Sequence, residues 1–489
     1  GAARGLVPHL TGKEALKAFG LKAGSAEAYA LTAEDFSALA GTYGRVGGLD
    51  RMATLVKAIR AQRPANTLLI DCGDTWQGSY TALASRGEDM VEAMNLLGVD
   101  VMVPHWEFTY GEARVKELVS KLKFPFLAQN VKDTEWEEDV FPHTATFERG
   151  GVKIAVIGQA FPYTPVANPR YMMPKWSFGI RDDEMQKRVD AARAAGAELV
   201  VVASHNGFDV DRKMAGRVKG IDVLLTGHTH DAIPGVVTVG DTLLVASGSH
   251  GKFLARLDLE VRNNKVVSHA FRLIPVFSDA IAADAEMAAF IARTRAPHQD
   301  VLGRKLARTE SLLYRRGNFN GTFDDLICRA LLDEREAEIS LSPGFRWGSS
   351  LPPGADITME DVYNQTAITY PNAYRSEMSG QMLKDILEDV ADNLFNPDPY
   401  YQQGGDMVRV GGLGYRIDIA KPMGRRIDAM TLLATGRAIE AGKSYVVSGW
   451  ASVNEGTQGP PVWEVVAGWL QKHPSVRFDA SRSVQVVGG

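Results

Sequence analysis

Two histidines one residue apart mark the segment of this chain that is richest in chemistry. His228 and His230 stand in Gly227-His228-Thr229-His230, directly after an apolar run, 221–225, that is typical of a short buried strand. A turn after a parallel strand lies at the carboxyl edge of a sheet, where α/β proteins bind their ligands. Side chains alternate along an extended backbone, so we expect both imidazoles to face one metal pocket. The alternative is a polar turn with two solvent-exposed histidines, and this motif alone does not decide between them.

Three further strand ends carry side chains that can bind metal. They are Asp74, His105 and His205, which follow the apolar runs 67–70, 100–103 and 198–203. One polar residue after a strand is often only a turn former, but four such strand ends in one region predict a metal site. Nitrogen and carboxylate ligands without thiolate suit zinc, manganese or iron. Five ligands are too many for one tetrahedral site with an open position, so we expect two metal ions bridged by Asp74.

The elements that must position these residues belong to a chain of 489 residues, long enough for two domains. Its hydrophobic content of 45% and charged content of 23% are those of an ordinary globular protein. A net charge of -5 argues against a nucleic-acid partner, and no apolar run reaches the length of a membrane span. The two cysteines, Cys72 and Cys328, have apolar neighbours, so we expect two buried free thiols.

Strands, polar turns and helices alternate along most of the chain, which predicts an α/β fold. Residues 1–44 look irregular, with only short amphipathic pieces, and the strand 253–261 is expected to complete the first sheet. The composition places a first domain at 1–278, a helical linker at 279–302 and a second α/β domain at 303–489.

The motifs, taken together, resemble those of calcineurin-like metallophosphoesterases, in the order typical of the 5′-nucleotidase branch. They are Gly73-Asp74 with Gln77-Gly78, Ser204-His205, and Gly227-His228-Thr229-His230. The resemblance implies an αββα sandwich followed by a 5′-nucleotidase-like C-terminal domain. It also implies that Asp74 bridges two metals, that His205 and His228 bind one of them, and that His230 helps to bind the other.

One motif departs from that branch, which has Gly-Asn-His-Glu followed two residues on by Asp. Here the run is Pro104-His105-Trp106-Glu107-Phe108-Thr109, so that His105 replaces a metal-binding asparagine. Trp106 replaces the catalytic histidine, and Thr109 replaces the aspartate that orients it. An indole cannot donate a proton as an imidazolium does, and a phosphate ester needs that proton for its basic leaving group. Glu107 is expected to support His105 or a turn rather than to bind metal.

Either the protein is therefore impaired as a phosphatase or its leaving group needs no proton. A sulfur anion is such a group, because even an ordinary thiol has a pKa of about 8.5. The positions that stack a nucleotide base in the nucleotidases correspond here to Gly404-Gly405-Asp406 and Asn454-Glu455-Gly456, which offer no aromatic ring. Nucleotide recognition is therefore expected to be lost.

These departures, with the run 105–111, resemble the SoxB family, the thiosulfohydrolases of bacterial sulfur oxidation. The resemblance implies two Mn²⁺ ions, a periplasmic location and a substrate carried by the SoxYZ protein. That substrate is a thiosulfonate on a cysteine of the carrier's flexible C-terminal arm. Its hydrolysis releases sulfate and leaves the carrier as a persulfide.

In the second domain, Arg346 is the main candidate for catalysis and substrate binding, alongside Asp74 in the first. Pro343-Gly344-Phe345-Arg346 resembles the phosphate-binding Gly-x-Arg loop of the nucleotidases. A guanidinium can donate two parallel hydrogen bonds to two sulfonate oxygens. The alternative is a solvated surface arginine. Weaker substrate-binding candidates are Asn372, Arg375 and Asn454.

The superfamily begins with a strand that carries Asp-x-His, and no such motif precedes Asp74. We therefore expect this chain to lack that strand and a signal peptide, and its sheet to have an unfilled edge beside Asp74. The protein is expected to be a monomer. Two other functions stay open: a periplasmic 5′-nucleotidase or related phosphoesterase, and a non-catalytic protein that binds metal or docks to a carrier.

Overall fold

The computed structural model describes residues 11–315, 317–481 and 483–487. The chain forms two compact units. The N-terminal unit comprises the described residues of Ala3–Gln77 together with Ser85–Ala296. The C-terminal unit comprises Gly78–Ala84 and the described residues of Pro297–Gly489. Within the described ranges, every helix is too short or too polar to cross a membrane.

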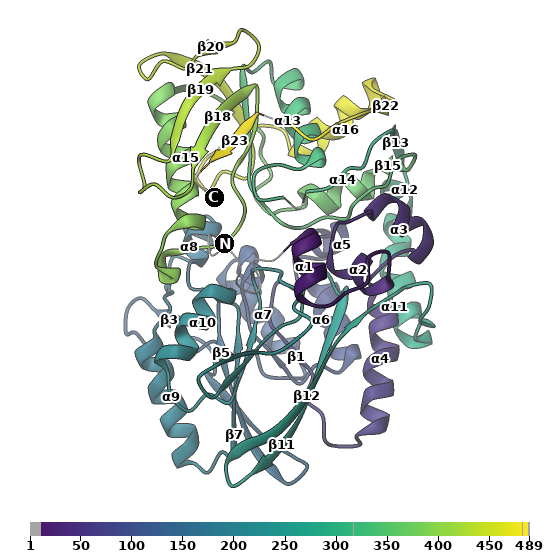
Figure 1. The fold of residues 1–489 in the computed structure, drawn as a ribbon, viewed down its shortest axis with the longest axis vertical. Coiled ribbons are helices and arrows are strands. Elements are labelled where there is room, and N and C mark those ends of the chain that lie inside the picture. Colours follow the sequence, from purple (N-terminus) through teal and green to yellow (C-terminus); the bar gives the residue numbers. More distant parts are fainter. Residues whose placement is uncertain (1–10, 316, 482, 488–489) are drawn as a thin grey trace. The chain divides into compact units, whose positions relative to one another are not determined.

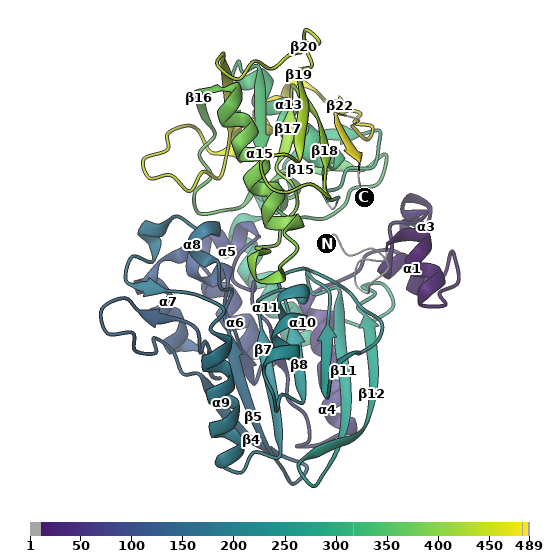
Figure 2. The same cartoon turned by 60° about the vertical axis from the view of Figure 1, so that its left-hand side comes forward.

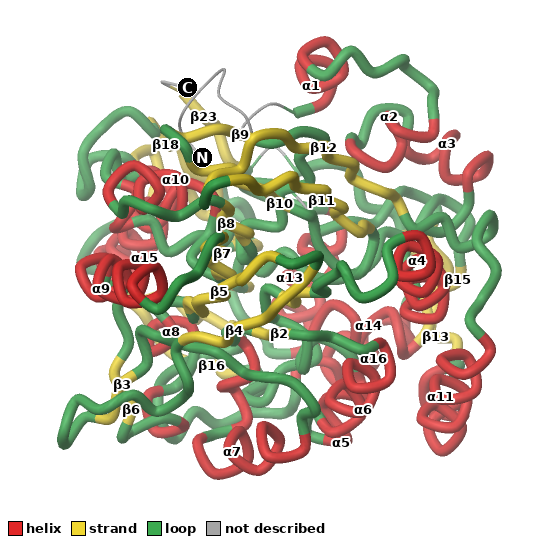
Figure 3. Tube along the Cα trace, turned by 90° about the horizontal axis from the view of Figure 1, so that it is seen from below, coloured by secondary structure: helices red, strands yellow, loops and turns green. Residues whose placement is uncertain are grey.

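A six-stranded sheet forms the centre of the N-terminal unit, in the order β4-β5-β7-β8-β10-β9. Its strands are β4 (Thr144–Arg149), β5 (Val152–Gln159), β7 (Leu199–Ser204), β8 (Val223–Thr226), β10 (Thr242–Ala246) and β9 (Val237–Val239). The four strands β5, β7, β8 and β10 run parallel, and the outer two are antiparallel to their neighbours. Figure 3 shows strands β4, β5, β7, β8 and β10 following one another across the unit. The parallel strands therefore share one carboxyl edge.

The two faces of this sheet are both buried, because alternate residues of each strand point to opposite sides. One face, with Ala155 and Ile157, packs on the helices α9 (Asp182–Ala194) and α10 (Phe208–Arg217). The other face, with Ile154 and Val156, packs on two small sheets. They are the parallel pair β1 (Ile70–Asp71) and β2 (Val101–Met102), and the antiparallel pair β11 (Phe253–Arg262) and β12 (Lys265–Pro275).

A second helical layer covers the small sheets. It contains α4 (Leu49–Gln62), α6 (Glu88–Leu97), α7 (Glu112–Lys121) and α11 (Ala285–Arg295). Met52, Val91, Leu118 and Met287 from these helices share one apolar core. Figures 1 and 3 show α4 and α6 on the side of the sheets that is opposite to α9 and α10, and Figure 2 shows the same elements turned by 60°. The unit is therefore the αββα sandwich that the sequence motifs implied.

Some segments differ from the expectations. Residues 12–43, expected to be irregular, form three short helices, α1 (Gly12–Ala18), α2 (Ala26–Leu31) and α3 (Phe36–Tyr43). Strand β11 does not extend the six-stranded sheet, because it pairs with β12 alone among the described strands. Helix α11 falls in the expected linker, yet Met287 and Phe290 are buried in the core of the N-terminal unit. Strand β1 has β2 as its one partner among the described strands, so no described strand fills its other edge.

The described part of the C-terminal unit contains three small sheets and four longer helices. The sheets have the orders β16-β21-β14-β17, β20-β19-β18-β23 and β15-β13-β22. Their strands are β13 (Lys305–Thr309), β14 (Ile339–Ser342), β15 (Asp356–Thr358), β16 (Tyr374–Ser379), β17 (Arg409–Gly411), β18 (Leu413–Asp418), β19 (Ile427–Leu432), β20 (Arg437–Ala438), β21 (Ser444–Gly449), β22 (Ser475–Val476) and β23 (Val484–Val487). The helices are α13 (Thr322–Glu334), α14 (Met359–Thr366), α15 (Gly380–Phe395) and α16 (Val462–Lys472). Leu383 and Leu387 of α15 pack with Leu341, Val447 and Leu413 of the first two sheets.

Shorter elements complete the description. They are η1 (Trp106–Tyr110), η2 (Arg170–Met172), η3 (Ala296–His298), η4 (Pro399–Tyr401), α5 (Tyr80–Ser85), α8 (Thr164–Ala167), α12 (Gln299–Leu302), β3 (Lys132–Asp133) and β6 (Trp176–Ser177). Both cysteines are free thiols, as expected, but Cys72 is half-buried, whereas Cys328 is buried.

Candidate metal centre

Four of the five predicted ligands meet at the carboxyl ends of four strands. Asp74, His105, His205 and His228 follow β1, β2, β7 and β8, and each offers one atom to a group whose members all lie within 4.8 Å of one another. One carboxylate and three imidazoles are a donor set suited to zinc, manganese or iron. The residues therefore fit one metal ion, held by four separate strand ends.

Asp74 stands at the centre of this group. Its Oδ1 lies 2.9 Å from Nδ1 of His105, and its Oδ2 lies 3.0 Å from Nε2 of His205. Burial alone would raise the pKa of Asp74, but the charges and hydrogen bonds of His205 and His105 hold that pKa well below its usual range. The side chain is therefore a carboxylate at neutral pH. Its two oxygens point to different neighbours, which suits a bridging role.

The ring of His205 is held in one orientation. Its Nδ1 donates to the carbonyl of Cys72, which leaves Nε2 as the nitrogen that faces Asp74. Two glycines make room for this ring. A Cβ on Gly73 or on Gly227 would lie 3.0 Å from Nδ1 of His205 and would press on a backbone carbonyl. The glycines before Asp74 and His228 are therefore required by the close approach of backbone carbonyls and of the His205 ring.

A buried carboxylate, Glu107, supports two of the ligand loops without belonging to the metal-binding group. It accepts hydrogen bonds from the backbone N–H of Thr75 at 2.6 Å and of His105 at 2.7 Å. Longer bonds of 3.3 Å come from the N–H groups of Asp74 and Trp76. Burial, aided by the charge of Asp74, raises the pKa of Glu107 to about 7. Glu107 thus supports His105 and the 74–76 turn, as expected.

The backbone of the site contains several residues in the left-handed region, which side chains other than glycine rarely adopt. They are Asp74 (φ 65°), His228 (φ 70°) and His230 (φ 59°). Because the chain turns at His228 instead of remaining extended, side-chain alternation does not apply there. The four-residue group does not include His230, so the expectation that His228 and His230 face one metal pocket stays a prediction. The ring of His230 lies 5.3 Å from that of His250, at 75°.

Two aromatic side chains were not foreseen from the sequence, Phe161 beside the four-residue group and His250 beside His230. Phe161 is buried and stacks on His228 with ring centroids 4.2 Å apart, and its ring lies 4.1 Å from that of His105. An apolar residue after a strand carries no metal signal, so nothing pointed to it. His250 follows β10 as the predicted ligands follow their strands, and the same criterion would have found it.

The substrate-binding candidates of the C-terminal unit lie in different surroundings. Nη1 of Arg346 donates to the carbonyl of Gly405 at 3.3 Å. The amide of Asn372 donates to the carbonyl of Thr457 at 2.6 Å, three residues beyond the exposed Asn454. Arg375 is exposed, and its Nε donates to the carbonyl of Arg335 at 3.0 Å, just beyond the end of α13. The structure therefore associates Asn372 with the loop of Asn454, and Arg375 with a helix terminus.

Three buried charged residues near the Arg346 loop were also missed. Arg315 pairs with Asp324 at 2.8 Å and donates to the carbonyl of Pro343 at 3.0 Å, and Arg409 contacts the other oxygen of Asp324 at 3.1 Å. Arginines spread through the sequence give no signal that they will be buried together. This cluster anchors the start of the loop that carries Arg346.

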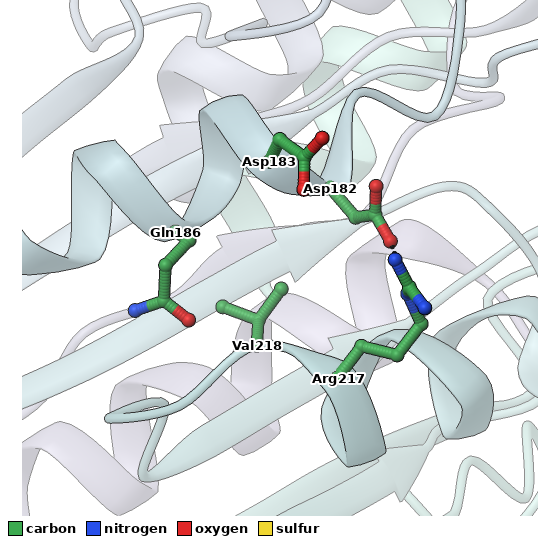
Figure 4. A pocket seen from close by; sticks show the side chains of 5 residues that line it. All are labelled: Asp182, Asp183, Gln186, Arg217 and Val218. Carbon is green, nitrogen blue, oxygen red and sulfur yellow. Dashed lines mark hydrogen bonds and ion pairs between the residues drawn. The ribbon is translucent and has the colours of Figure 1, made fainter.

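A surface pocket on the N-terminal unit shares no lining residue with the four-residue group. Figure 4 shows it between α9 and α10, lined by Asp182, Asp183, Gln186, Arg217 and Val218. Arg217 and Asp182 pair across it at 2.5 Å. None of its lining residues is a predicted ligand.

Comparison with known proteins points to one class of hydrolase. Residues 305–466 match the family described as 5′-nucleotidase, C-terminal domain. The 5′-nucleotidase of Bos taurus is 25% identical over 451 residues, which cover 83% of this chain and 76% of that protein. The structure of a 5′-nucleotidase precursor from Thermus thermophilus has the same fold, with a TM-score of 0.79 and 22% identity over 91% of this chain and 94% of that one.

A further structure is much more similar. Thermus thermophilus sulfate thiohydrolase SoxB, solved in complex with glycerol, has a TM-score of 0.95 and 37% identity, over 98% of this chain and 90% of that chain. The αββα sandwich, the four-ligand group and the C-terminal domain define a metallophosphoesterase-type hydrolase of the 5′-nucleotidase branch. Within that branch, the chain belongs to the SoxB family.

Proposed function

We propose that this protein hydrolyses a cysteine S-thiosulfonate on a SoxYZ-type carrier protein. Water adds to the terminal sulfonate sulfur, the bond from that sulfur to the sulfane sulfur breaks, and sulfate leaves. The electron pair of the broken bond stays on the sulfane sulfur, so the carrier keeps a cysteine persulfide. The likeness to a sulfate thiohydrolase along almost the whole chain supports this proposal.

The observation that carries the proposal is the identity of residues 106 and 109. In the resembling nucleotidases a histidine and an aspartate at these positions supply a proton to the leaving alkoxide. Here they are Trp106 and Thr109, both buried in η1, and neither can act as an acid near neutral pH. A persulfide leaves as a stabilised sulfur anion, because sulfur acids are far stronger than alcohols. The lack of an acid at residues 106 and 109 therefore does not hinder thiosulfonate hydrolysis, because the leaving persulfide needs no proton.

We assign the metal-binding roles as follows. Asp74, His105, His205 and His228 hold one ion, and Asp74 with His230 contributes to a second, both ions being Mn²⁺. When bound, two such ions supply positive charge that polarises the sulfonate and acidifies water. Glu107 and the carbonyl of Cys72 fix the ligand loops and the His205 ring, so the donors are oriented before metal and substrate arrive.

The remaining assignments concern substrate and location. Arg346 is proposed to grip the sulfonate oxygens, since a planar guanidinium matches them and stabilises the charge that develops there. Asn372, Arg375 and Asn454 are assigned weaker contributions to substrate binding. We place the reaction in the periplasm, with the C-terminal arm of the carrier as partner and the enzyme as a monomer, on the family resemblance.

The second candidate is a periplasmic 5′-nucleotidase, favoured by the match of residues 305–466 and by the identity to animal 5′-nucleotidases. Both activities can be measured on one preparation of the purified chain, loaded with Mn²⁺. Sulfate release from a thiosulfonate-modified carrier and phosphate release from AMP are followed side by side. Sulfate release with little phosphate release is expected, whereas efficient AMP hydrolysis with no sulfate release would replace the proposal by the nucleotidase.

A further inference from the structure

A second buried carboxylate, Asp211, lies behind the metal-binding group. It belongs to α10 and is fully buried. Its Oδ1 accepts hydrogen bonds from the hydroxyl of Ser204 at 2.8 Å and from the amide of Asn206 at 2.9 Å. Its Oδ2 accepts from the hydroxyl of Thr226 at 2.5 Å. All three partners donate, so the site is built for a side chain that accepts hydrogen bonds.

These three donors are placed around the ligands His205 and His228. Ser204 and Asn206 flank His205, while Thr226 lies two residues before His228. Ser204 and Thr226 face each other as the last paired residues of the neighbouring parallel strands β7 and β8. Asp211 therefore joins the ends of the two strands at the point where each one passes into its ligand.

We propose that Asp211 is a positioning residue that sets the separation of His205 and His228 in the metal centre. This inference rests on the metal centre of the proposed function. A metal ion binds tightly only when its donors are already held at the right spacing, and residues that hold ligands commonly affect metal affinity by 10–100-fold. A main-chain hydrogen bond from the N–H of Gly227 to the carbonyl of Ser204, at 2.9 Å, joins the two strand ends, and Asp211 adds side-chain links beside it.

The chain offers a matched control at the other end of the same two strands. Asp222 directly precedes β8, and its Oδ2 accepts from the backbone N–H of Val200 in β7 at 2.7 Å. It also pairs with Arg193 at 2.5 Å. Asp222 therefore connects β7 and β8 as Asp211 does, but away from the ligands. Its loss weakens the fold without changing the spacing of His205 and His228.

The test compares Asp211→Asn and Asp222→Asn with the unsubstituted 489-residue chain. Binding of Mn²⁺ alone is measured from the electron paramagnetic resonance of free Mn²⁺, and Co²⁺ is used to record the absorption spectrum of the bound ion. An asparagine at 211 points an N–H₂ group at donors, so we expect Mn²⁺ affinity to fall about 10–100-fold and the Co²⁺ spectrum to change. Asp222→Asn should lower the melting temperature while leaving both metal readouts unchanged.

Each outcome either supports or contradicts the positioning role of Asp211. Unchanged Mn²⁺ affinity and an unchanged Co²⁺ spectrum in folded Asp211→Asn would overturn the positioning role while leaving the metal centre intact. Equal losses in Asp211→Asn and Asp222→Asn would also overturn it, since general destabilisation would explain both. If the unsubstituted chain binds neither Mn²⁺ nor Co²⁺, both the metal centre and the positioning role of Asp211 are contradicted. Should Asp211→Asn not fold, Thr226→Val decides: a smaller loss of affinity supports the role, and no loss overturns it.

Discussion

The backbone N–H of Trp106 donates a hydrogen bond to Oδ1 of Asp74 at 3.1 Å. Residue 106 is thus bound directly to the central carboxylate of the metal-binding group, although its own side chain has no acid to offer. Its indole is 7% exposed and is held within η1. The position that supplies a proton in the resembling nucleotidases is therefore kept at the site, but with a side chain of different chemistry.

Restoring the missing acid should restore phosphoesterase chemistry. In the double variant Trp106→His with Thr109→Asp, an imidazolium can protonate an alkoxide, and a positioned acid contributes roughly 10²–10⁴-fold. We expect AMP hydrolysis to rise toward that range, with no gain in sulfate release from the carrier. Trp106→Phe with Thr109→Asp is the control, since it changes packing but adds no imidazole. Equal AMP turnover in the two double variants, both checked to be folded, would contradict the leaving-group argument.

Removal of Asp74 should affect both metals, whereas removal of His230 should affect one. Only a bridging carboxylate serves two ions, and His230 lies outside the four-residue group. We expect Asp74→Ala to lose both Mn²⁺ ions and His230→Ala to keep one, by metal analysis after gel filtration. His269→Ala, at an exposed histidine of β12, should match the unsubstituted chain. Retention of two ions by Asp74→Ala would rule out the bridge.

Glu107→Gln should weaken both the fold and the metal centre. A carboxamide can satisfy fewer of the four N–H groups that Glu107 accepts, and a buried unsatisfied donor costs about 1–3 kcal/mol. We expect a loss of that size in urea unfolding, together with lower Mn²⁺ affinity. Glu92→Gln, at an exposed glutamate of α6, is the control. A variant as stable as the unsubstituted chain would show that these hydrogen bonds are not needed.

The pH dependence of stability should contain a contribution from Asp325 of α13. Burial, and then the charge of Asp324, raise the pKa of Asp325 to about 7, whereas in an unfolded chain it is about 3.9. Between these values the folded chain holds a proton that the unfolded chain has released, so stability falls as pH rises. Asp325→Asn removes this effect. Its stability relative to the unsubstituted chain should grow from pH 4 to 7, by at most about 4 kcal/mol and by less where solvent reaches the group.

Urea unfolding of both proteins at several pH values measures this difference. Glu117→Gln is a useful comparison, because that exposed glutamate has its pKa lowered to about 2 by hydrogen bonds from Arg114 and Lys121. The stability of Glu117→Gln relative to the unsubstituted chain should therefore fall, not grow, as pH rises. A difference between Asp325→Asn and the unsubstituted chain that stays constant from pH 4 to 8 would contradict the shifted pKa.

The sequence was informative wherever one residue type is required by local chemistry. Strand ends with Asp74, His105, His205 and His228 could be recognised because four of them occur in one region, whereas a single polar residue after a strand is often only a turn former. Their convergence followed from the shared carboxyl edge of parallel strands. The layered α/β fold followed from the alternation of strands and helices, and the αββα arrangement from the resemblance.

Long-range packing was not predictable in the same way. The alternating pattern of β11 indicates a strand but not its partner, and its pairing with β12 outside the six-stranded sheet depends on distant contacts. The backbone at His228 is left-handed instead of extended, and no local rule assigns a positive φ to a histidine. Phe161 and Asp211 are ordinary core and helix residues by sequence. Their positions behind and beside the ligands exist only in the folded chain.

The most direct test of the proposed function is the chemical fate of the carrier's cysteine. A SoxYZ-type carrier, or a peptide of its C-terminal arm, is loaded with a cysteine S-thiosulfonate and incubated with the Mn²⁺-loaded chain. Mass spectrometry then follows the cysteine while sulfate is measured in solution. We expect loss of the sulfonate group with retention of the sulfane sulfur, and one sulfate for each persulfide formed. An unaltered thiosulfonate, under conditions in which the same preparation hydrolyses AMP efficiently, would contradict it.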